Sequence, residues 1–204
     1  VQVVLSLLKI IDNSSQDIPL AAVLLSSIGG FSKKETALIK SSAGEEKTFH
    51  ESCRWYMENG EDEKLCKKLQ DFYAMLEDFR QQAAFTPIHE LLWYLFDVTG
   101  YAEEAAAMPA GEQRAQNLNM LVQKAWDYEK TSYRGLFNFI RYIENLQKYD
   151  VDYGEARSLG ENRNVVQIMS IHRSKGLEFP VVFLGGLEKQ FNRMDTRSRM
   201  VLDA

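Results

Sequence analysis

The sequence has little cysteine and no long apolar run. Cys53 and Cys66 are its only cysteines, which predicts reduced thiols and a cytoplasmic protein rather than a secreted disulfide scaffold. No apolar run approaches the roughly 18 residues that a membrane-spanning helix needs. The first residues also lack the basic start and cleavage site of a signal peptide. We therefore expect no association with a membrane.

An excess of positive charge is also missing. The net charge is −5, which argues against a uniformly basic surface for nucleic acid. The charge is unevenly distributed, because residues 161–204 have a net charge of +2 and residues 1–160 a net charge of −7. The basic C-terminal stretch can contribute to a phosphate-facing site that it shares with another part of a larger protein.

Several chemistries lack their motifs. No G-x-x-x-x-G-K-[ST] occurs, so the chain encodes no phosphate-binding P-loop. His50, His89 and His172 are far apart in the sequence, and the two cysteines do not form a C-x-x-C pair. We therefore expect no metal site and no catalytic residue within this chain.

Two groups of residues have both a structural and a functional interpretation. Cys53 is expected to pack in the core rather than to react. Trp93, Tyr94 and Phe96 could stack nucleic-acid bases, but their helical spacing beside leucines favours the core. The acidic cluster of residues 58–63 could hold a cation, although a solvated helix start is the preferred interpretation.

What is present is apolar periodicity typical of helices. Ser32 and Glu35 form an S-x-x-E capping box, and Thr86 is expected to cap a helix with Pro87 at its first position. The pattern predicts helices over residues 1–11, 17–28, 36–40, 48–59, 61–83, 87–99, 111–130 and 133–148.

The composition changes after residue 149. Residues 150–164 predict a loop, and residues 165–171 and 180–184 are nearly continuous β-branched and apolar runs. Such runs predict strands that are buried on both faces of a parallel sheet. Two strands do not make a stable sheet alone. We therefore expect a mostly α piece of a longer protein, in which a helical domain stands beside a partial α/β segment with about two buried strands.

Polar residues lie between the two predicted strands. The first strand delivers His172, Arg173 and Lys175 to a tight turn at Gly176, and Glu178 follows. Ligands usually bind at the carboxyl ends of strands in an α/β sheet. The cations can neutralise phosphate, the glycine allows close backbone approach, and the carboxylate can accept hydrogen bonds from a sugar. The alternative is an exposed turn with ordinary surface charges.

The same stretch resembles motif V of the superfamily 1 helicases of the UvrD/Rep/RecB kind, whose core is T-x-H-x-x-K-G-L-E-F. Residues 170–179 read S-I-H-R-S-K-G-L-E-F, so Ser170 replaces the commoner threonine. Residues 185–192 then read G-G-L-E-K-Q-F-N, which is similar to the A subunit of AddAB-type helicase–nucleases. The resemblance is sharp in residues 165–195, and the helical part matches by order and apolar pattern.

The resemblance implies a domain organisation. In these helicases a helical insertion, domain 2B, interrupts the RecA-like domain 2A before motif V. Residues 1–13 would be the end of a 2A segment, residues 14–160 the 2B-type insertion, and residues 161–204 the return to 2A.

The resemblance also implies residue roles. Motif V touches both ligands of the motor. The residues implied to contact single-stranded DNA are Ser170, His172 and Arg173. The residues implied to contact ATP are Gly176, Glu178 and Lys175. One turn that touches both ligands would couple the nucleotide state to the grip on DNA.

The implied parent is an ATP-dependent DNA helicase/exonuclease of the bacterial cytoplasm, associated with the nucleoid, that repairs double-strand breaks by recombination. It would use ATP and Mg²⁺, act on single-stranded and duplex DNA, and pair with an AddB-type nuclease partner. The alternatives are a UvrD/PcrA-type helicase without a nuclease and a stand-alone helical interaction module. By itself this piece is expected to be inactive, because the Walker motifs, motif VI and the nuclease residues would lie elsewhere.

Overall fold

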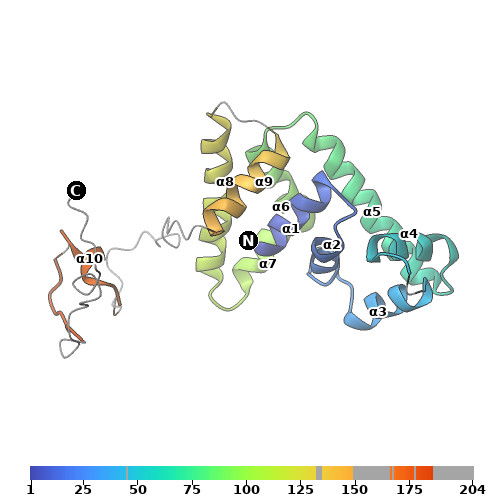
Figure 1. Cartoon of the computed structure of the whole chain (residues 1–204), viewed down its shortest axis with the longest axis horizontal. Coiled ribbons are helices and arrows are strands. Elements are labelled where there is room, and N and C mark those ends of the chain that lie inside the picture. The colour runs from blue at the N-terminus through green and yellow to red at the C-terminus, as the bar shows by residue number, and fades with distance from the viewer. Residues whose placement is uncertain (45, 132–134, 149–165, 167, 177, 186–204) are drawn as a thin grey trace, which may run out of the picture. The chain divides into compact units, whose positions relative to one another are not determined.

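The structure is a computed structural model that describes residues 1–44, 46–131, 135–148, 166, 168–176 and 178–185 (Figure 1). The chain divides into two compact units, Val1–Gly160 and Glu161–Ala204. The two units are described separately below.

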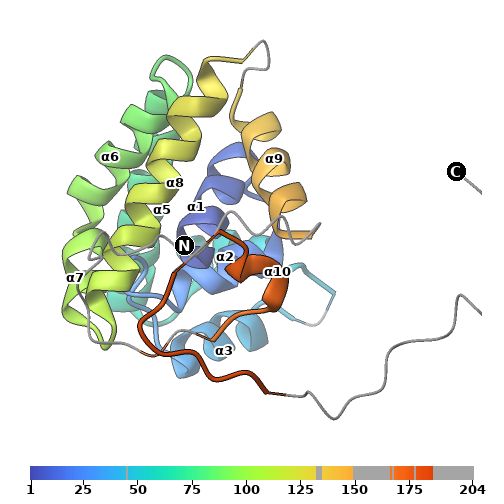
Figure 2. The ribbon, with the colours of Figure 1, turned by 90° about the vertical axis from the view of Figure 1, so that its left-hand side faces the viewer.

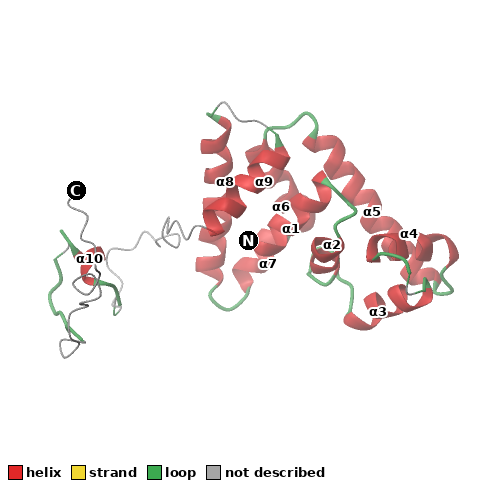
Figure 3. Cartoon of the chain, viewed as in Figure 1, coloured by secondary structure: helices red, strands yellow, loops and turns green. Residues whose placement is uncertain are grey.

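The first unit consists of helices joined by short loops, and no strand occurs in its described residues (Figure 3). The helices are α1 (Gln2–Asp12), α2 (Asp17–Leu24), α3 (Lys33–Ser42), α4 (Phe49–Asn59), α5 (Glu63–Ala83), α6 (Ile88–Thr99), α7 (Tyr101–Ala107), α8 (Gly111–Glu129) and α9 (Leu136–Lys148). The expectation of a mostly α chain is confirmed.

Helix α1 provides much of the core. It packs against α2, α5 and α9, whereas α6, α7 and α8 pack against one another (Figure 2). Burying a leucine or isoleucine contributes roughly 1.5–3 kcal/mol, so α1 is a main source of stability. Its buried side chains are Val4, Leu5, Leu7, Leu8, Ile10 and Ile11.

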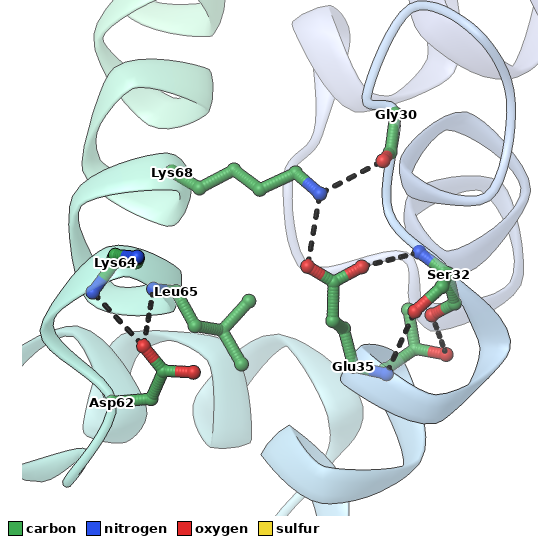
Figure 4. Close-up of polar contacts among 8 residues, drawn as sticks. Gly30, Ser32, Glu35, Asp62, Lys64, Leu65 and Lys68 are labelled. Atoms are coloured by element: carbon green, nitrogen blue, oxygen red, sulfur yellow. Dashed lines mark hydrogen bonds and ion pairs between the residues drawn. The ribbon is translucent and has the colours of Figure 1, made fainter.

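The predicted capping box at the start of α3 is present (Figure 4). The Glu35 N–H donates to Ser32 Oγ at 3.2 Å, and the Ser32 N–H donates to Glu35 Oε2 at 2.6 Å. Lys68 of α5 adds to this network, because its ammonium contacts Glu35 Oε1 at 3.0 Å and the Gly30 carbonyl at 2.8 Å. The box thus joins two helices as well as starting one.

Helix α4 begins at a second capping box, between Thr48 and Glu51. A carboxylate from α2 caps the same helix, since Asp17 accepts from the Phe49 N–H at 2.8 Å and the His50 N–H at 3.0 Å. Helix N-termini leave their first N–H groups without intrahelical partners. The acceptor therefore comes from a residue more than thirty positions away.

The acidic residues before α5 act as expected for a helix start. Asp62 is the N-cap and accepts hydrogen bonds from the backbone of Lys64 at 3.0 Å and Leu65 at 3.2 Å (Figure 4). The structure thus gives this part of the cluster a structural role.

Helix α2 is shorter than predicted. It ends at Leu24 rather than near residue 28. The Ser26 hydroxyl donates to the Val23 carbonyl at 2.6 Å, and the Phe31 N–H donates to the Leu24 carbonyl at 2.9 Å. Gly30 then adopts a positive φ of 67°, which suits glycine. These bonds satisfy the last helical carbonyls and end the helix early.

The start of α6 also differs from the prediction. Pro87 is the N-cap and Ile88 the first helical residue, so Thr86 does not cap the helix. The carboxylate of Glu129, at the end of α8, instead accepts from the Ile88 N–H and contacts His89 Nδ1. The sequence near the helix could not reveal a cap from a distant helix.

The described residues of the second unit contain one helical turn, α10 (Ile171–Ser174), and no strand. The two predicted buried strands are therefore not formed in these residues. Ile168 is 96% exposed and Phe183 is 93% exposed. A strand needs a neighbour for its backbone groups, and the described residues provide none.

Candidate functional site

The predicted site residues lie in and around α10. Ser170 is the N-cap, with an extended backbone, and its hydroxyl makes no capping bond. The Ser170 carbonyl accepts from the Ser174 N–H at 3.2 Å, and the Ser174 hydroxyl donates to the Ile171 carbonyl at 2.8 Å. The turn is thus held by its own backbone, and the Ser170 side chain stays exposed.

His172 lies within this turn, and its side chain is exposed. Arg173 is the next residue of α10, and the prediction for its side chain lies outside the described part of the structure. Residues 186–195, on which the finer family resemblance partly depends, lie outside it too.

The turn ends at a glycine whose conformation requires glycine. Gly176 has a φ of 82°, in the left-handed region, and no described atom lies within 4 Å of where a Cβ would stand. Lys175 before it and Glu178 after it are both exposed. The backbone is therefore open to close approach by a ligand on this side.

The arrangement brings a hydroxyl, an imidazole, an ammonium and a carboxylate into one short segment. Within the described residues, no ion pair engages His172, Lys175 or Glu178. Exposed, unpaired groups of both signs can bind a ligand that carries phosphates and hydroxyls. No group of three or more His, Cys, Asp or Glu in the described part of the chain could hold a metal ion.

The prediction for Cys53 is confirmed. Its side chain is fully buried, and burial raises the pKa of the thiol to about 12. Because the thiolate is the nucleophile, this cysteine is unreactive at neutral pH in the folded chain.

The prediction for Trp93 is wrong, although its neighbour Phe96 is buried as expected. Trp93 is 51% exposed, and Trp126 of α8 is 52% exposed. Both line a groove of about 310 Å³ between α6 and α8. A tryptophan among leucines on a helix is normally core, and only the packing of α8 decides that this one faces outward.

A second hollow of about 430 Å³ lies between α5 and the loop after α2. Gly29 lines it together with Lys64, Lys67 and Lys68. Lys68 is already engaged by Gly30 and Glu35, and Asp71 lines the same hollow. The hollow is therefore only weakly basic.

Comparison with known proteins gives a consistent result. The family model described as UvrD-like helicase C-terminal domain matches residues 1–192. The A subunit of an ATP-dependent helicase/nuclease from Clostridium acetobutylicum is 49% identical over 195 residues, which are 96% of this chain and 15% of that protein. The protein of the same name from Anoxybacillus flavithermus is 45% identical over 203 residues, 100% of this chain and 17% of the relative. That from Bacillus licheniformis is 45% identical over 204 residues, 100% of this chain and 16% of the relative.

The chain thus spans roughly one-sixth of the length of these curated relatives. Among the described residues, none of the helices combines the length and the apolar character needed to cross a membrane.

Proposed function

Because this chain belongs to the family of UvrD-like helicase C-terminal domains, we propose that it works as part of one subunit of an ATP-dependent DNA helicase/nuclease. Relatives that bear the name of such a helicase/nuclease match nearly the whole chain at 41% to 49% identity. The parent protein would use ATP to move along DNA in the repair of double-strand breaks by recombination, in the bacterial cytoplasm.

The domain assignment is part of this proposal. Residues 14–160 would form the 2B-type helical insertion, and residues 161–204 would return the chain to RecA-like domain 2A. The compact helical unit that ends at Gly160 supports this boundary. Helix α1 packs within the helical unit, and the assignment of residues 1–13 to domain 2A stays a prediction.

The observation that carries the proposed roles is the exposed turn at residues 170–178. Ser170 and His172 would contact phosphates of single-stranded DNA, with Arg173 beside them. Such contacts are independent of base sequence, which suits a motor. Their number is small, so this chain alone would bind DNA weakly and in a salt-sensitive way.

The other end of the turn would face ATP. The open backbone at Gly176, the Lys175 ammonium and the Glu178 carboxylate fit a phosphate group next to a ribose hydroxyl. Bound ATP would supply the free energy of phosphoryl transfer. This chain would contribute binding and orientation only. The described residues offer no cluster for Mg²⁺, so no step through the metal is assigned to them.

The nuclease partner and the DNA substrates are finer parts of the proposal. The relatives' names, which describe one lettered subunit of a helicase/nuclease, favour a helicase with a nuclease and a second subunit over a UvrD/PcrA-type helicase without one. They also disfavour a stand-alone interaction module. Single-stranded DNA would lie along motif V. Duplex DNA would be held mainly by other parts of the parent, since residues 1–160 have a net charge of −7.

The test is made in the full-length protein that contains this chain. His172→Ala is expected to weaken single-stranded DNA binding and to raise the DNA concentration that half-saturates ATP hydrolysis. Glu178→Ala is expected to raise the KM for ATP by about tenfold, the effect of losing a hydrogen bond to a charged group, with DNA binding nearly unchanged.

Glu58→Ala is the matched control, because Glu58 is an exposed carboxylate on α4 outside the turn. It is expected to leave both quantities unchanged. If the His172 and Glu178 variants behave like this control, the assignment of the turn to DNA and ATP is wrong.

A further inference from the structure

The groove between α6 and α8 is a surface that the proposed motor role does not use. We call it the Trp groove, and its lining residues are Trp93, Asn119, Val122, Gln123, Trp126 and Lys130. Val122 forms its buried floor, and the two amide side chains are exposed. The groove is therefore an apolar depression with hydrogen-bonding groups along one helix.

Both indoles are held in place by neighbouring rings. The Trp93 ring meets Phe96 edge-on, with centroids 6.0 Å apart. The Trp126 ring lies 4.8 Å from His89, whose Nδ1 contacts the Glu129 carboxylate. Half-exposed, preordered tryptophans are rare on free surfaces and are enriched at the centres of protein interfaces.

The charge beside the groove is negative. Residues 88–107, which form α6 and α7, contain four acidic residues and no lysine or arginine. Two of the four, Glu90 and Asp97, are exposed and lie three positions before and four after Trp93, so they flank its indole on the helix surface.

The one lysine in the groove does not offset this charge. Lys130 is paired with Asp127 at 3.1 Å and lies over the Trp126 ring, 5.5 Å from its centroid. Stacking of nucleic-acid bases on the tryptophans would bring phosphates toward Glu90 and Asp97, which is unfavourable.

We propose that the Trp groove docks a basic segment of a partner protein, in which an apolar side chain is flanked by arginine or lysine. The apolar side chain would rest on Val122 between the two indoles. The flanking cations would face Glu90 and Asp97 or stack on the indole faces. Asn119 and Gln123 would pair with the partner's main chain.

The probe is a short synthetic peptide with a central Leu-Phe pair flanked on both sides by arginine. Its matched control has glutamate in place of each arginine. Binding to the full chain is followed by the change in tryptophan fluorescence and, independently, by calorimetry. The arginine peptide is expected to bind and to shift the tryptophan emission, more weakly as salt is raised. The glutamate peptide is expected not to bind.

Variants locate the binding. Trp93→Ala and Trp126→Ala are expected to weaken arginine-peptide binding about tenfold or more, as for interface hot spots. Phe137→Ala is the control, because Phe137 is a similarly exposed aromatic, on α9 and outside the groove. It is expected to change nothing. Circular dichroism verifies that each variant is folded.

Surface variants keep the proposal testable if the tryptophan variants unfold. The double change Glu90→Lys with Asp97→Lys is expected to abolish the preference for the arginine peptide. The proposal is overturned if neither peptide binds, if both bind equally, or if these changes have no effect. It is also overturned if oligothymidylate, rather than the arginine peptide, shifts the fluorescence in a Trp93-dependent way.

Discussion

Glu35 shows how one carboxylate serves two interactions at once. It completes the capping box of α3 and accepts a charged hydrogen bond from Lys68 of α5. The bonds from the Ser32 backbone and side chain, followed by Lys68, lower the pKa of the Glu35 carboxyl from 4.5 to about 2. The ionised form is thus the one that the fold stabilises.

We expect Glu35→Ala to lower the free energy of unfolding at neutral pH by about 1 kcal/mol, the usual value of a helix cap. The folded-state pKa lies below the unfolded one, so this contribution is present above the unfolded pKa of about 4.5. It is lost as the pH falls through the folded pKa of about 2. Urea unfolding of both proteins across this range measures the difference.

Two matched variants separate the causes. Glu35→Gln can keep the capping bond but loses the charge toward Lys68, so its effect should fall between those of wild type and Glu35→Ala. Glu51 completes the second capping box and has no lysine partner among the ion pairs of the described residues. Glu51→Ala is therefore expected to cost less than Glu35→Ala. A difference between wild type and Glu35→Ala that persists unchanged at the lowest pH would contradict this account.

At the scale of elements, several helix ends are completed by side chains from other helices. Asp17 caps α4, and Glu129 caps α6. Arg80 of α5 donates to the carbonyls of Ile10 at 2.8 Å and Ile11 at 3.2 Å, near the end of α1. Helix termini leave backbone groups that need partners, so these contacts fix which helices meet.

We expect Asp17→Ala to destabilise the chain by about 1–2 kcal/mol, because it leaves the first N–H groups of α4 without an acceptor. Asp17→Asn should recover part of this, since its amide oxygen can accept one bond. Chemical denaturation followed by circular dichroism is the measurement.

Asp71→Ala is the control for that series, because Asp71 is an exposed carboxylate on α5. Its expected effect is within about 0.5 kcal/mol, as for ordinary surface positions. Equal effects of the Asp17 and Asp71 changes would show that the cap from α2 contributes nothing.

At the scale of the whole molecule, the two units differ in what they bury. The first has a continuous apolar core that extends from α1 to α9. In the second, the described β-branched and aromatic residues lie largely exposed, among them Val166, Ile168, Val181 and Phe183. Exposed apolar segments of this kind favour association.

We therefore expect the full chain to associate reversibly as its concentration rises, and residues 1–160 alone to remain monomeric. Sedimentation velocity over a dilution series measures this. The double change Ile168→Lys with Phe183→Lys should reduce association of the full chain without loss of helical content. A full chain that stays monomeric at every concentration would show that these residues are covered in solution.

The sequence by itself determined the helical class, most helix positions and the family. Apolar periodicity and the local S-x-x-E box at Ser32 depend on residues a few positions apart, and the structure confirms them. The family resemblance, confirmed by the match over residues 1–192, is also local, because motif V is one contiguous turn. The roles of Ser170, His172, Arg173, Lys175, Gly176 and Glu178 stay predictions.

Only the tertiary structure decided what depends on distant residues. The end of α2, the caps from Asp17 and Glu129, and the outward position of Trp93 all follow from contacts between helices. The two predicted strands show the same limit. Their side chains favour a buried sheet, but a strand forms only where a neighbour pairs with its backbone, and no partner strand lies among the described residues.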